Sequence, residues 1–165
     1  MLRILHSLLF FFSAASLYGQ THNIWTFGYY QGLDFTVEPP AQFRSAQISW
    51  VGTCGSISDS AGRLLFYTNG RHAWNRNHEL MQNGTLINRF GEPTQGMVIL
   101  PVPGQYRQYR IFMAGQYDDR DDLGLASYLV DMTANDGLGA VVGGPYRHYD
   151  SVYCDKLTTV RHANN

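Results

Sequence analysis

The hydrophobic positions of this chain lie in short runs that polar turn signals interrupt. The segment "ISDSAGRLLFYTNG", residues 57–70, places a Ser/Asp/Gly break between two apolar runs and closes on Asn-Gly. Short apolar runs bounded by Gly, Asn, Asp and Ser are typical of antiparallel strands joined by tight turns. The pattern predicts two groups of four strands, at residues 46–58, 64–69, 71–75 and 85–89, and at residues 96–102, 108–115, 125–131 and 138–142.

The predicted turns carry the residues that their backbone geometry favours. An Asp side chain at the start of a turn accepts hydrogen bonds from backbone amides that follow it, and Asn and Gly tolerate the positive φ of two-residue hairpin turns. The sequence therefore predicts structural turns at Asp59 and Gly62, at Asn69 and Gly70, and at Asn83 and Gly84. The same reasoning favours a structural role for the Asp59 carboxylate over a catalytic one.

The two groups of strands are related by an internal repeat. A shift of 42 positions places "ISDSAG" (57–62) on "ILPVPG" (99–104), and after a few inserted residues "LLFYT" falls on "YRIFMA". A third start appears at "LTTVRHANN" (157–165), at a spacing of about 60 residues from the second. Repeated units of four short strands are typical of propeller blades.

The repeat therefore predicts an all-β fold. We expect a partial β-propeller with about two four-stranded antiparallel blades, a leading strand within residues 22–36, and the start of a third blade. Because a closed propeller needs roughly four to eight blades, residues 20–165 are expected to be the N-terminal part of a truncated propeller-like domain.

The first residues resemble a secretory signal peptide. Arg3 is the only charged residue in the first thirty-three positions, and it precedes the apolar run "ILHSLLFFFSAASL", which ends in small residues. This run is shorter than the roughly 20 apolar residues of a membrane-spanning helix. We expect residues 1–19 to be removed, leaving Gln20 at the new terminus, with a cut after Ser16 as the alternative, and the protein to be secreted or held at the outer cell surface.

Composition supports the all-β prediction and excludes one class of binding partner. The chain contains 11 Tyr, 9 Phe, 3 Trp and 17 Gly, which favours strands and turns over helices. Its formal net charge of −1 provides no basic face to neutralise phosphates, so nucleic acid is not expected as a partner. No later segment is apolar for long enough to span a membrane.

The two cysteines lie far apart in the sequence. An exported protein can form a disulfide, which makes Cys54 and Cys154 candidates for one. Their separation of one hundred residues leaves open whether they meet, and two buried free thiols are the favoured alternative.

No cofactor or metal site is predicted. His72, and the pair His78 and Glu79, lack a third ligand at zinc-binding spacing. The acidic run "DDRDD" at residues 118–122 could supply oxygen ligands to calcium, but it lacks the ligand alternation and the glycine of an EF-hand loop. A solvated hairpin tip is the favoured interpretation of that run.

Aromatic side chains offer the best functional lead. Most are expected to pack between the blades, while exposed Trp and Tyr rings stack on sugars or anchor protein partners. The aromatics considered are Trp25, Tyr29, Tyr30, Trp50, Trp74, Tyr117 and Tyr146; possible surface-binding residues are Trp74, Asn75, Tyr117 and Tyr146.

Several segments resemble a known family. The runs "NIWTFGYYQGLDF", "GSISDSAGRLLFYTNGRHAWNRNHELMQNG", "TQGMVILPVPG", "YLVDMTANDGLGAVV" and "DKLTTVRHANN" are similar to the N-terminal β-propeller-like (WD40/YVTN-like) domain of large secreted Bacteroidota surface proteins. Those proteins often carry PKD modules and a type IX secretion signal and are described as gliding-motility-associated. The resemblance covers nearly all of residues 23–165. It carries over no catalytic residue, and Asp155 stands where the family usually has Glu.

Two functions remain open at this stage. The first is a non-enzymatic binding or scaffold module that recognises protein or glycan at the cell surface through loops at one rim. The alternative is a propeller-fold polysaccharide hydrolase, with Asp34, Asp59 and Asp155 as candidate carboxylates and with catalytic residues partly outside this chain. No feature of the sequence selects a pair from these three, so no catalytic residue is assigned.

Overall fold

The structure is a computed structural model that describes residues 22–44, 46–49, 52–86, 95–114, 124–149 and 156–159. The predictions that fall on residues 1–19, 118–122, Trp50, Tyr117, Cys154 and Asp155 lie outside these described residues. No helix in the described ranges has the length and apolar character needed to cross a membrane.

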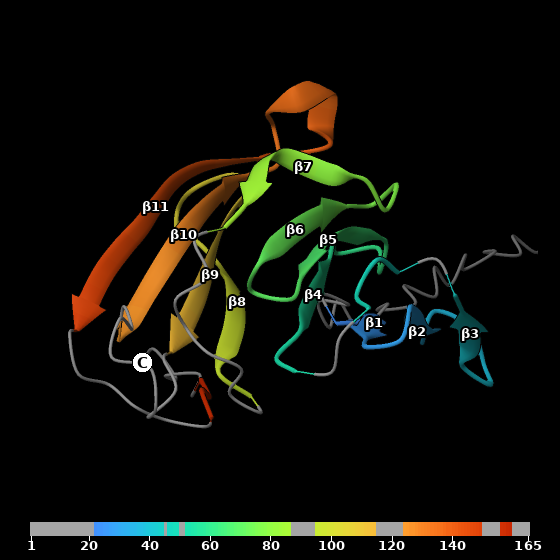
Figure 1. The fold of residues 1–165 in the computed structure, drawn as a ribbon. Coiled ribbons are helices and arrows are strands. Elements are labelled where there is room, and N and C mark those ends of the chain that lie inside the picture. The colour runs from blue at the N-terminus through green and yellow to red at the C-terminus, as the bar shows by residue number, and fades with distance from the viewer. Residues whose placement is uncertain are drawn as a thin grey trace, which may run out of the picture.

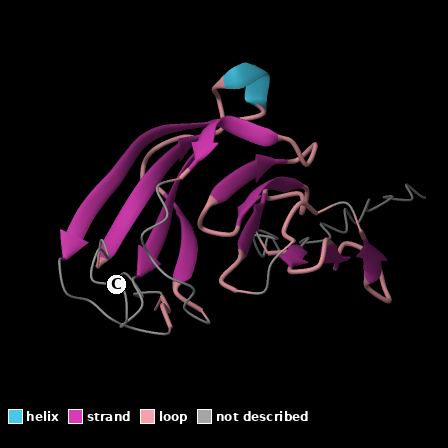
Figure 2. Ribbon diagram, in the orientation of Figure 1, coloured by secondary structure: helices cyan, strands magenta, loops and turns pink. Residues whose placement is uncertain are grey.

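The fold is all-β, as the sequence predicts (Figures 1 and 2). A first meander of four antiparallel strands contains β4 (Gly55–Ser58), β5 (Leu64–Thr68), β6 (His72–Asn75) and β7 (Leu80–Thr85). A second meander contains β8 (Met97–Pro101), β9 (Gln108–Ala114), β10 (Leu125–Asp131) and β11 (Ala140–Tyr149). A 3₁₀ turn, η1 (Asn135–Gly137), precedes β11. Two consecutive four-stranded meanders are compatible with two propeller blades.

The meanders share the repeat that the sequence shift of 42 indicates. In the first, Ile57 of β4 pairs with Phe66 of β5, and in the second, Ile99 of β8 pairs with Ile111 of β9. All four side chains are buried. The turn that follows the first strand contains a glycine with positive φ in each copy, 80° at residue 62 and 72° at residue 104.

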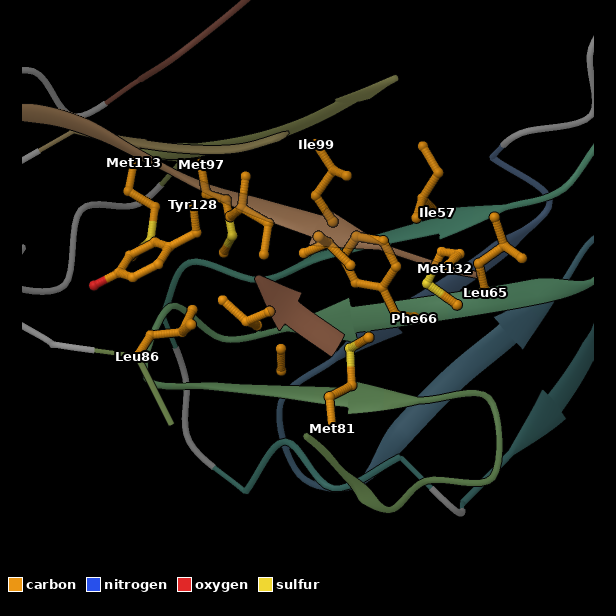
Figure 3. Packing of buried hydrophobic residues seen from close by; sticks show 14 of the residues in the cluster. Ile57, Leu65, Phe66, Met81, Leu86, Met97, Ile99, Met113, Tyr128 and Met132 are labelled. Atoms are coloured by element: carbon orange, nitrogen blue, oxygen red, sulfur yellow. The ribbon is translucent and has the colours of Figure 1, made fainter. Parts of the chain in front are cut away.

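One hydrophobic core lies between the two meanders (Figure 3). It combines side chains of the first meander, among them Phe66 and Met81, with side chains of the second, among them Ile111 and Val130. The meanders also touch at one edge, where the outermost strands β7 and β11 run parallel through a single registered pair. The eight strands therefore form one sheet, in the order β4-β5-β6-β7-β11-β10-β9-β8, that encloses the core like a nearly closed barrel. This arrangement is loosely compatible with two adjacent propeller blades.

A separate three-stranded antiparallel sheet stands in place of the expected single leading strand. It contains β1 (Ile24–Phe27), β2 (Gln31–Asp34) and β3 (Ala41–Phe43) and lies on the side of the first meander away from the second (Figure 1). The Ser56 hydroxyl donates to the Ile24 carbonyl oxygen at 2.6 Å and ties this sheet to β4. The prediction missed the hairpin because "GYYQG" contains no Asn-Gly signal; Tyr29 and Tyr30 instead adopt positive φ.

Three predicted strand boundaries were wrong. Strand β4 begins at Gly55 rather than at residue 46, since residues 46–49 belong to no strand although Ala46 and Ile48 are buried. Strand β7 occupies residues 80–85 and so begins five residues before the predicted strand 85–89, of which residues 87–89 lie outside the described ranges. Strand β11 is ten residues long, where the sequence predicted only residues 138–142.

The predicted turn at Asn83 and Gly84 is also wrong, because both residues lie inside β7. Asn83 has φ of 57°, and a Cβ on Gly84 would come within 2.6 Å of the Ala73 carbonyl oxygen on the neighbouring strand. Glycine is needed here for close approach of two backbones in an irregular stretch of sheet.

The expected third blade is only partly within the described residues. Lys156 forms an isolated parallel bridge with Gln95, just before β8. The described residues 157–159 belong to no strand, and residues 160–165 lie outside the described ranges.

Candidate functional site

A cleft of about 770 Å³ opens where turns of the two meanders meet. It is bounded by the β4–β5 and β6–β7 turns of the first meander and by the β8–β9 and β10–β11 connections of the second. We call it the rim cleft, and its lining consists of Ser58, Asp59, Ser60, Arg63, Leu64, Leu65, Arg76, Tyr106, Arg107, Tyr109, Asp136 and Gly137. Both meanders direct their first and third turns to this side, because successive hairpins of a meander alternate between its two ends.

The β4–β5 turn supplies a rigid wall of the cleft. The Asp59 carboxylate accepts hydrogen bonds from the backbone N–H groups of Ala61 and Arg63, each at 2.9 Å. It also forms an ion pair with the Arg63 guanidinium, whose Nε and Nη2 both lie 2.8 Å from Oδ2. The sequence predicted hydrogen bonds from backbone N–H groups to the Asp59 carboxylate ahead of Gly62. It did not predict the ion pair with Arg63.

These contacts keep Asp59 ionised. Burial alone would raise the pKa of its carboxyl, but the hydrogen bonds from Arg63 and Ala61 and the charge of Arg63 outweigh that effect, and the pKa is lowered. The carboxylate is therefore committed to holding the turn and Arg63.

The second meander contributes Arg107, whose backbone is strained. A contact between the two meanders bounds the cleft at one end. Arg107 has φ of 56°, in the left-handed region that non-glycine residues seldom occupy. Across the cleft, Arg76 Nη1 donates to the Gly137 carbonyl oxygen at 2.7 Å, which joins the β6–β7 turn to η1. Among the residues that the structure describes, the Arg107 guanidinium makes no hydrogen bond or ion pair.

Two tyrosines of the β8–β9 hairpin form the aromatic part of the lining. Tyr109 packs edge-on against Phe66 of the core, with ring centroids 5.8 Å apart. Burial raises the pKa of Tyr109; Arg107 acts to lower it, while Asp59 and Tyr106 act to raise it. The Tyr106 ring is 80% exposed, so it stands at the mouth of the cleft with both faces largely in solvent.

Ser58 adds a buried hydroxyl to the wall of the cleft. The residue is 0% exposed, and its Oγ has no hydrogen-bond partner within the described part of the chain. Buried polar groups without a partner are few in native structures, and each calls for an explanation such as a bound molecule.

Three of the four possible surface-binding residues can be placed in the structure. Asn75 is only 2% exposed, and its Oδ1 accepts from the N–H groups of Asn77 and Glu79. The surface role was wrong for Asn75, because its amide builds the β6–β7 turn. Trp74 is half-buried and stacks on Tyr67 at 5.4 Å between ring centroids.

Tyr146 of β11 is the most accessible of the three, at 45% exposure. The Arg110 guanidinium lies over its ring, 5.2 Å from the centroid. Tyr146 is not part of the rim cleft.

The Asn69 side chain builds the turn between β5 and β6. Its Oδ1 accepts from the N–H groups of Arg71 and His72, at 3.0 and 2.9 Å. Gly70 has φ of 83°, as a two-residue hairpin turn requires, and a Cβ there would come within 2.8 Å of Met113 Cε.

Cys54 is a free thiol, and Cys154, its candidate disulfide partner, lies outside the described residues. The Cys54 Sγ donates to the Thr26 carbonyl oxygen at 3.2 Å, and burial raises the pKa of the thiol. Within the described ranges, no group of three or more His, Cys, Asp and Glu side chains is placed to hold a metal ion.

Sequence reasoning missed the arginines and tyrosines of the rim cleft. Each lies in or beside a predicted turn, and the repeat already implied that the first turns of both units face the same side. The repeat would have placed Arg63 and Arg107 on the same side of adjacent units, but whether the two turns share a cleft depends on how the units pack.

Scans against protein-family models, curated proteins and solved structures found no match to this chain.

Proposed function

We propose that this protein is a non-enzymatic, secreted or cell-surface binding and scaffold module that recognises protein or glycan through the rim cleft. The observation that carries the proposal is the cleft itself, in which turns from both meanders converge on one concavity of about 770 Å³. This volume falls in the range of ligand-binding pockets, roughly 300–1,000 Å³. Binding sites are also commonly formed by loops on a rigid scaffold.

The chemistry of the lining supports binding. Tyr and Arg are enriched where proteins bind partners, since they combine large contact area with directional hydrogen bonds. Both residue types are present in the cleft, and Arg107 has donors that no described residue uses. The scaffold below them is rigid, because the Asp59 and Asn75 side chains each fasten a turn through two backbone amides.

The hydrolase alternative gains less support from the described residues. A glycosidase needs one carboxyl group that stays protonated, with a raised pKa, beside one that is ionised. The pKa of Asp59 is lowered, and its oxygens are occupied by the turn. Asp34 lies on β2, outside the cleft, where its Oδ1 accepts from the Thr36 N–H and hydroxyl groups.

The proposed location rests on two features of the sequence. Residues 1–19 have the pattern of a secretory signal peptide. The chain also resembles the propeller-like domain of secreted Bacteroidota surface proteins associated with gliding motility, PKD modules and type IX secretion. A binding module with a rigid rim would suit either adhesion or assembly of a surface structure.

A variant that fills the cleft tests the proposal. Ser60 is an exposed turn residue in the lining, so Ser60→Trp should obstruct the cleft without disturbing the core. Gln42→Trp on β3, also exposed, places the same ring on the other sheet and serves as the control. Arrays of glycans and of peptides should show ligands bound by the unmodified protein and by Gln42→Trp but lost from Ser60→Trp. Equal binding by all three proteins would show that the cleft is not the site.

A further inference from the structure

We infer that the rim cleft binds an acidic glycan, that is, a sugar chain bearing carboxylate or sulfate groups, with Arg107 holding the anionic group and Tyr106 stacking on a sugar ring. This inference rests on the proposed function and names the ligand class of the same cleft. The shared chemistry is an anion attached to a hydroxylated sugar ring.

The local charge of the cleft opposes that of the whole chain. The chain has a formal net charge of −1, whereas three arginines and two aspartates line the cleft. The Arg63 charge is matched by Asp59 in an ion pair at 2.8 Å, which leaves Arg76, Arg107 and Asp136 in the lining. Arg107 also acts on Asp131, just outside the lining, and helps to lower its pKa. The residues that line the cleft therefore carry one more positive charge than negative charge, within a concave wall where charge attraction exceeds that on an open surface.

Arg107 is the arginine best placed to take an anion. Arg63 uses Nε and Nη2 on Asp59, and Arg76 uses Nη1 on the Gly137 carbonyl. Arg107 has no such partner among the described residues, so the whole planar fork of its guanidinium remains available. That fork matches the oxygens of a carboxylate or a sulfate in a bidentate arrangement.

The backbone conformation at Arg107 is a second, independent observation that supports a ligand site. Its φ of 56° is energetically costly for a non-glycine residue, and such residues cluster where ligands bind. Asp136, in the β10–β11 connection of the same meander, also lines the cleft and has φ of 53°. Two turns of the second meander with costly backbone geometry therefore lie in the lining.

The uncharged part of the lining fits a sugar. Tyr106 exposes 80% of its surface, and an exposed aromatic face offers an apolar platform with a polar tip. Ser58 also lines the cleft, and its buried Oγ has no partner in the described chain.

An acidic peptide is less well suited to the cleft. Extended peptides are commonly captured by adding a strand to an open sheet edge. The lining consists mainly of turn residues. Its strand residues are Ser58, Leu64, Leu65 and Tyr109, and they belong to strands that are already paired within the sheet. Recognition here must come from side chains, which suits a glycan.

Calorimetric titration of the purified protein tests the inference with defined probes. Tetragalacturonate carries carboxylates, a carrageenan tetrasaccharide carries sulfates, cellotetraose is neutral, and tetraglutamate is an acidic peptide. We expect at least one acidic glycan to bind and cellotetraose to bind at least about tenfold more weakly. Which acidic glycan binds more tightly distinguishes carboxylate from sulfate as the anion.

Variants locate the anion. Arg107→Gln should weaken acidic-glycan binding by about tenfold or more, and Arg107→Lys, which keeps the charge but loses the fork, should fall between. Tyr106→Ala should weaken the binding of the acidic glycan. It should not increase the preference for acidic glycans over tetraglutamate. Arg44→Gln removes an exposed arginine outside the cleft and should leave affinity unchanged. Circular dichroism of each variant shows that the fold is retained.

Each adverse result has a separate meaning. Acidic glycans that bind no better than cellotetraose, or Arg107→Gln binding as tightly as the unmodified protein, would overturn the inference. Tetraglutamate binding more tightly than both acidic glycans, and lost from Ser60→Trp, would overturn the glycan assignment while leaving the rim cleft as a binding site. Acidic-glycan binding that survives Ser60→Trp would overturn both proposals.

Discussion

Arg76 Nη1 donates a hydrogen bond to the Gly137 carbonyl oxygen at 2.7 Å, and this contact joins the two meanders at the edge of the rim cleft. The two residues are 61 positions apart in the sequence, so the bond forms only when both meanders are folded and packed. It therefore links the stability of the fold to the shape of the cleft.

Loss of this contact should loosen the packing of the two meanders. Arg76→Ala is expected to lower the free energy of unfolding by about 1 kcal/mol, since one charge-assisted hydrogen bond is lost at an exposed position. Urea denaturation followed by circular dichroism measures the change. Arg44→Ala, which removes an exposed arginine outside the cleft, should change the free energy of unfolding by less than about 0.5 kcal/mol. Equal effects of the two variants would mean that the bond to Gly137 contributes nothing.

The Asp59 turn should make stability depend on pH in the acid range. The pKa of Asp59 is lowered in the folded protein, whereas its unperturbed value is 3.8. Its stabilising contribution is therefore complete above the unfolded pKa and is lost as the pH falls through the lower, folded pKa. Asp59→Ala should cost about 1–2 kcal/mol at neutral pH and less at pH 3, because the turn amides and Arg63 lose their acceptor.

The prediction for Asp59 is checked by urea denaturation of Asp59→Ala and of the unmodified protein at a series of pH values. Asp131 has a pKa lowered mainly by the hydroxyl and N–H groups of Thr133, so it contributes to acid sensitivity as well. The difference between Asp59→Ala and the unmodified protein isolates the Asp59 term. A difference that stays constant from pH 7 to pH 3 would contradict the account, since the range spans about the unperturbed Asp pKa.

His78 gives a second pH dependence, nearer to neutrality. Its Nδ1 lies 3.1 Å from the Tyr67 hydroxyl, within hydrogen-bond distance, and that hydroxyl also accepts from the Gln47 N–H. Burial lowers the pKa of His78 below 6.5. The unfolded chain therefore binds the proton more readily, and stability should fall as the pH decreases below about 6.5 and level off below the folded pKa.

His78→Asn removes this titration while keeping a residue that tolerates the positive φ of 63° at this position. The variant should flatten the slope of unfolding free energy against pH between about pH 5 and 7. The matched control is His22→Asn, which replaces an exposed histidine. It should leave the slope of unfolding free energy against pH unchanged. A slope unchanged in His78→Asn would assign the effect to another group.

Much of the fold could be predicted from the sequence because its signals are local. Alternation and turn residues located strands close to their observed positions, and the repeat placed Ile57 and Ile99 at equivalent positions. The Asn-Gly signal failed at Asn83, since the same dipeptide serves a hairpin turn or a close approach of two strands, and only the neighbouring backbone decides which.

The candidate site was less predictable because it depends on packing between distant segments. Asp59 was identified as a turn residue, but its neighbour across the cleft, Arg107, carries no motif of its own. Asn75 looked like a polar surface residue next to Trp74, and its burial follows from the tight β6–β7 turn that its own side chain organises. Such roles depend on which loops meet in space.

The shared core should make the two meanders unfold together. Ile111 is fully buried between them, so Ile111→Ala should lower the free energy of unfolding by about 2–5 kcal/mol through lost contacts and the cavity left behind. Val142→Ala, at an exposed position of β11, should cost less than about 0.5 kcal/mol. Tryptophan fluorescence reports Trp25, Trp50 and Trp74, which all precede the second meander in the sequence, and it should shift to the same lower midpoint as circular dichroism. Separate midpoints would show that the meanders fold independently.

The most direct test of the central claim, that the two meanders meet in a ligand-binding cleft, is a nuclear magnetic resonance titration of isotope-labelled protein with tetragalacturonate and with the carrageenan tetrasaccharide. The rival surface is the exposed aromatic group on the three-stranded sheet, Trp25, Phe27, Tyr29, Tyr30 and Phe35. Our account predicts that the shifted amides cluster at residues 58–65, 76, 106–109 and 136–137, in both meanders at once. Shifts confined to residues 24–37, or none with either probe, would contradict it.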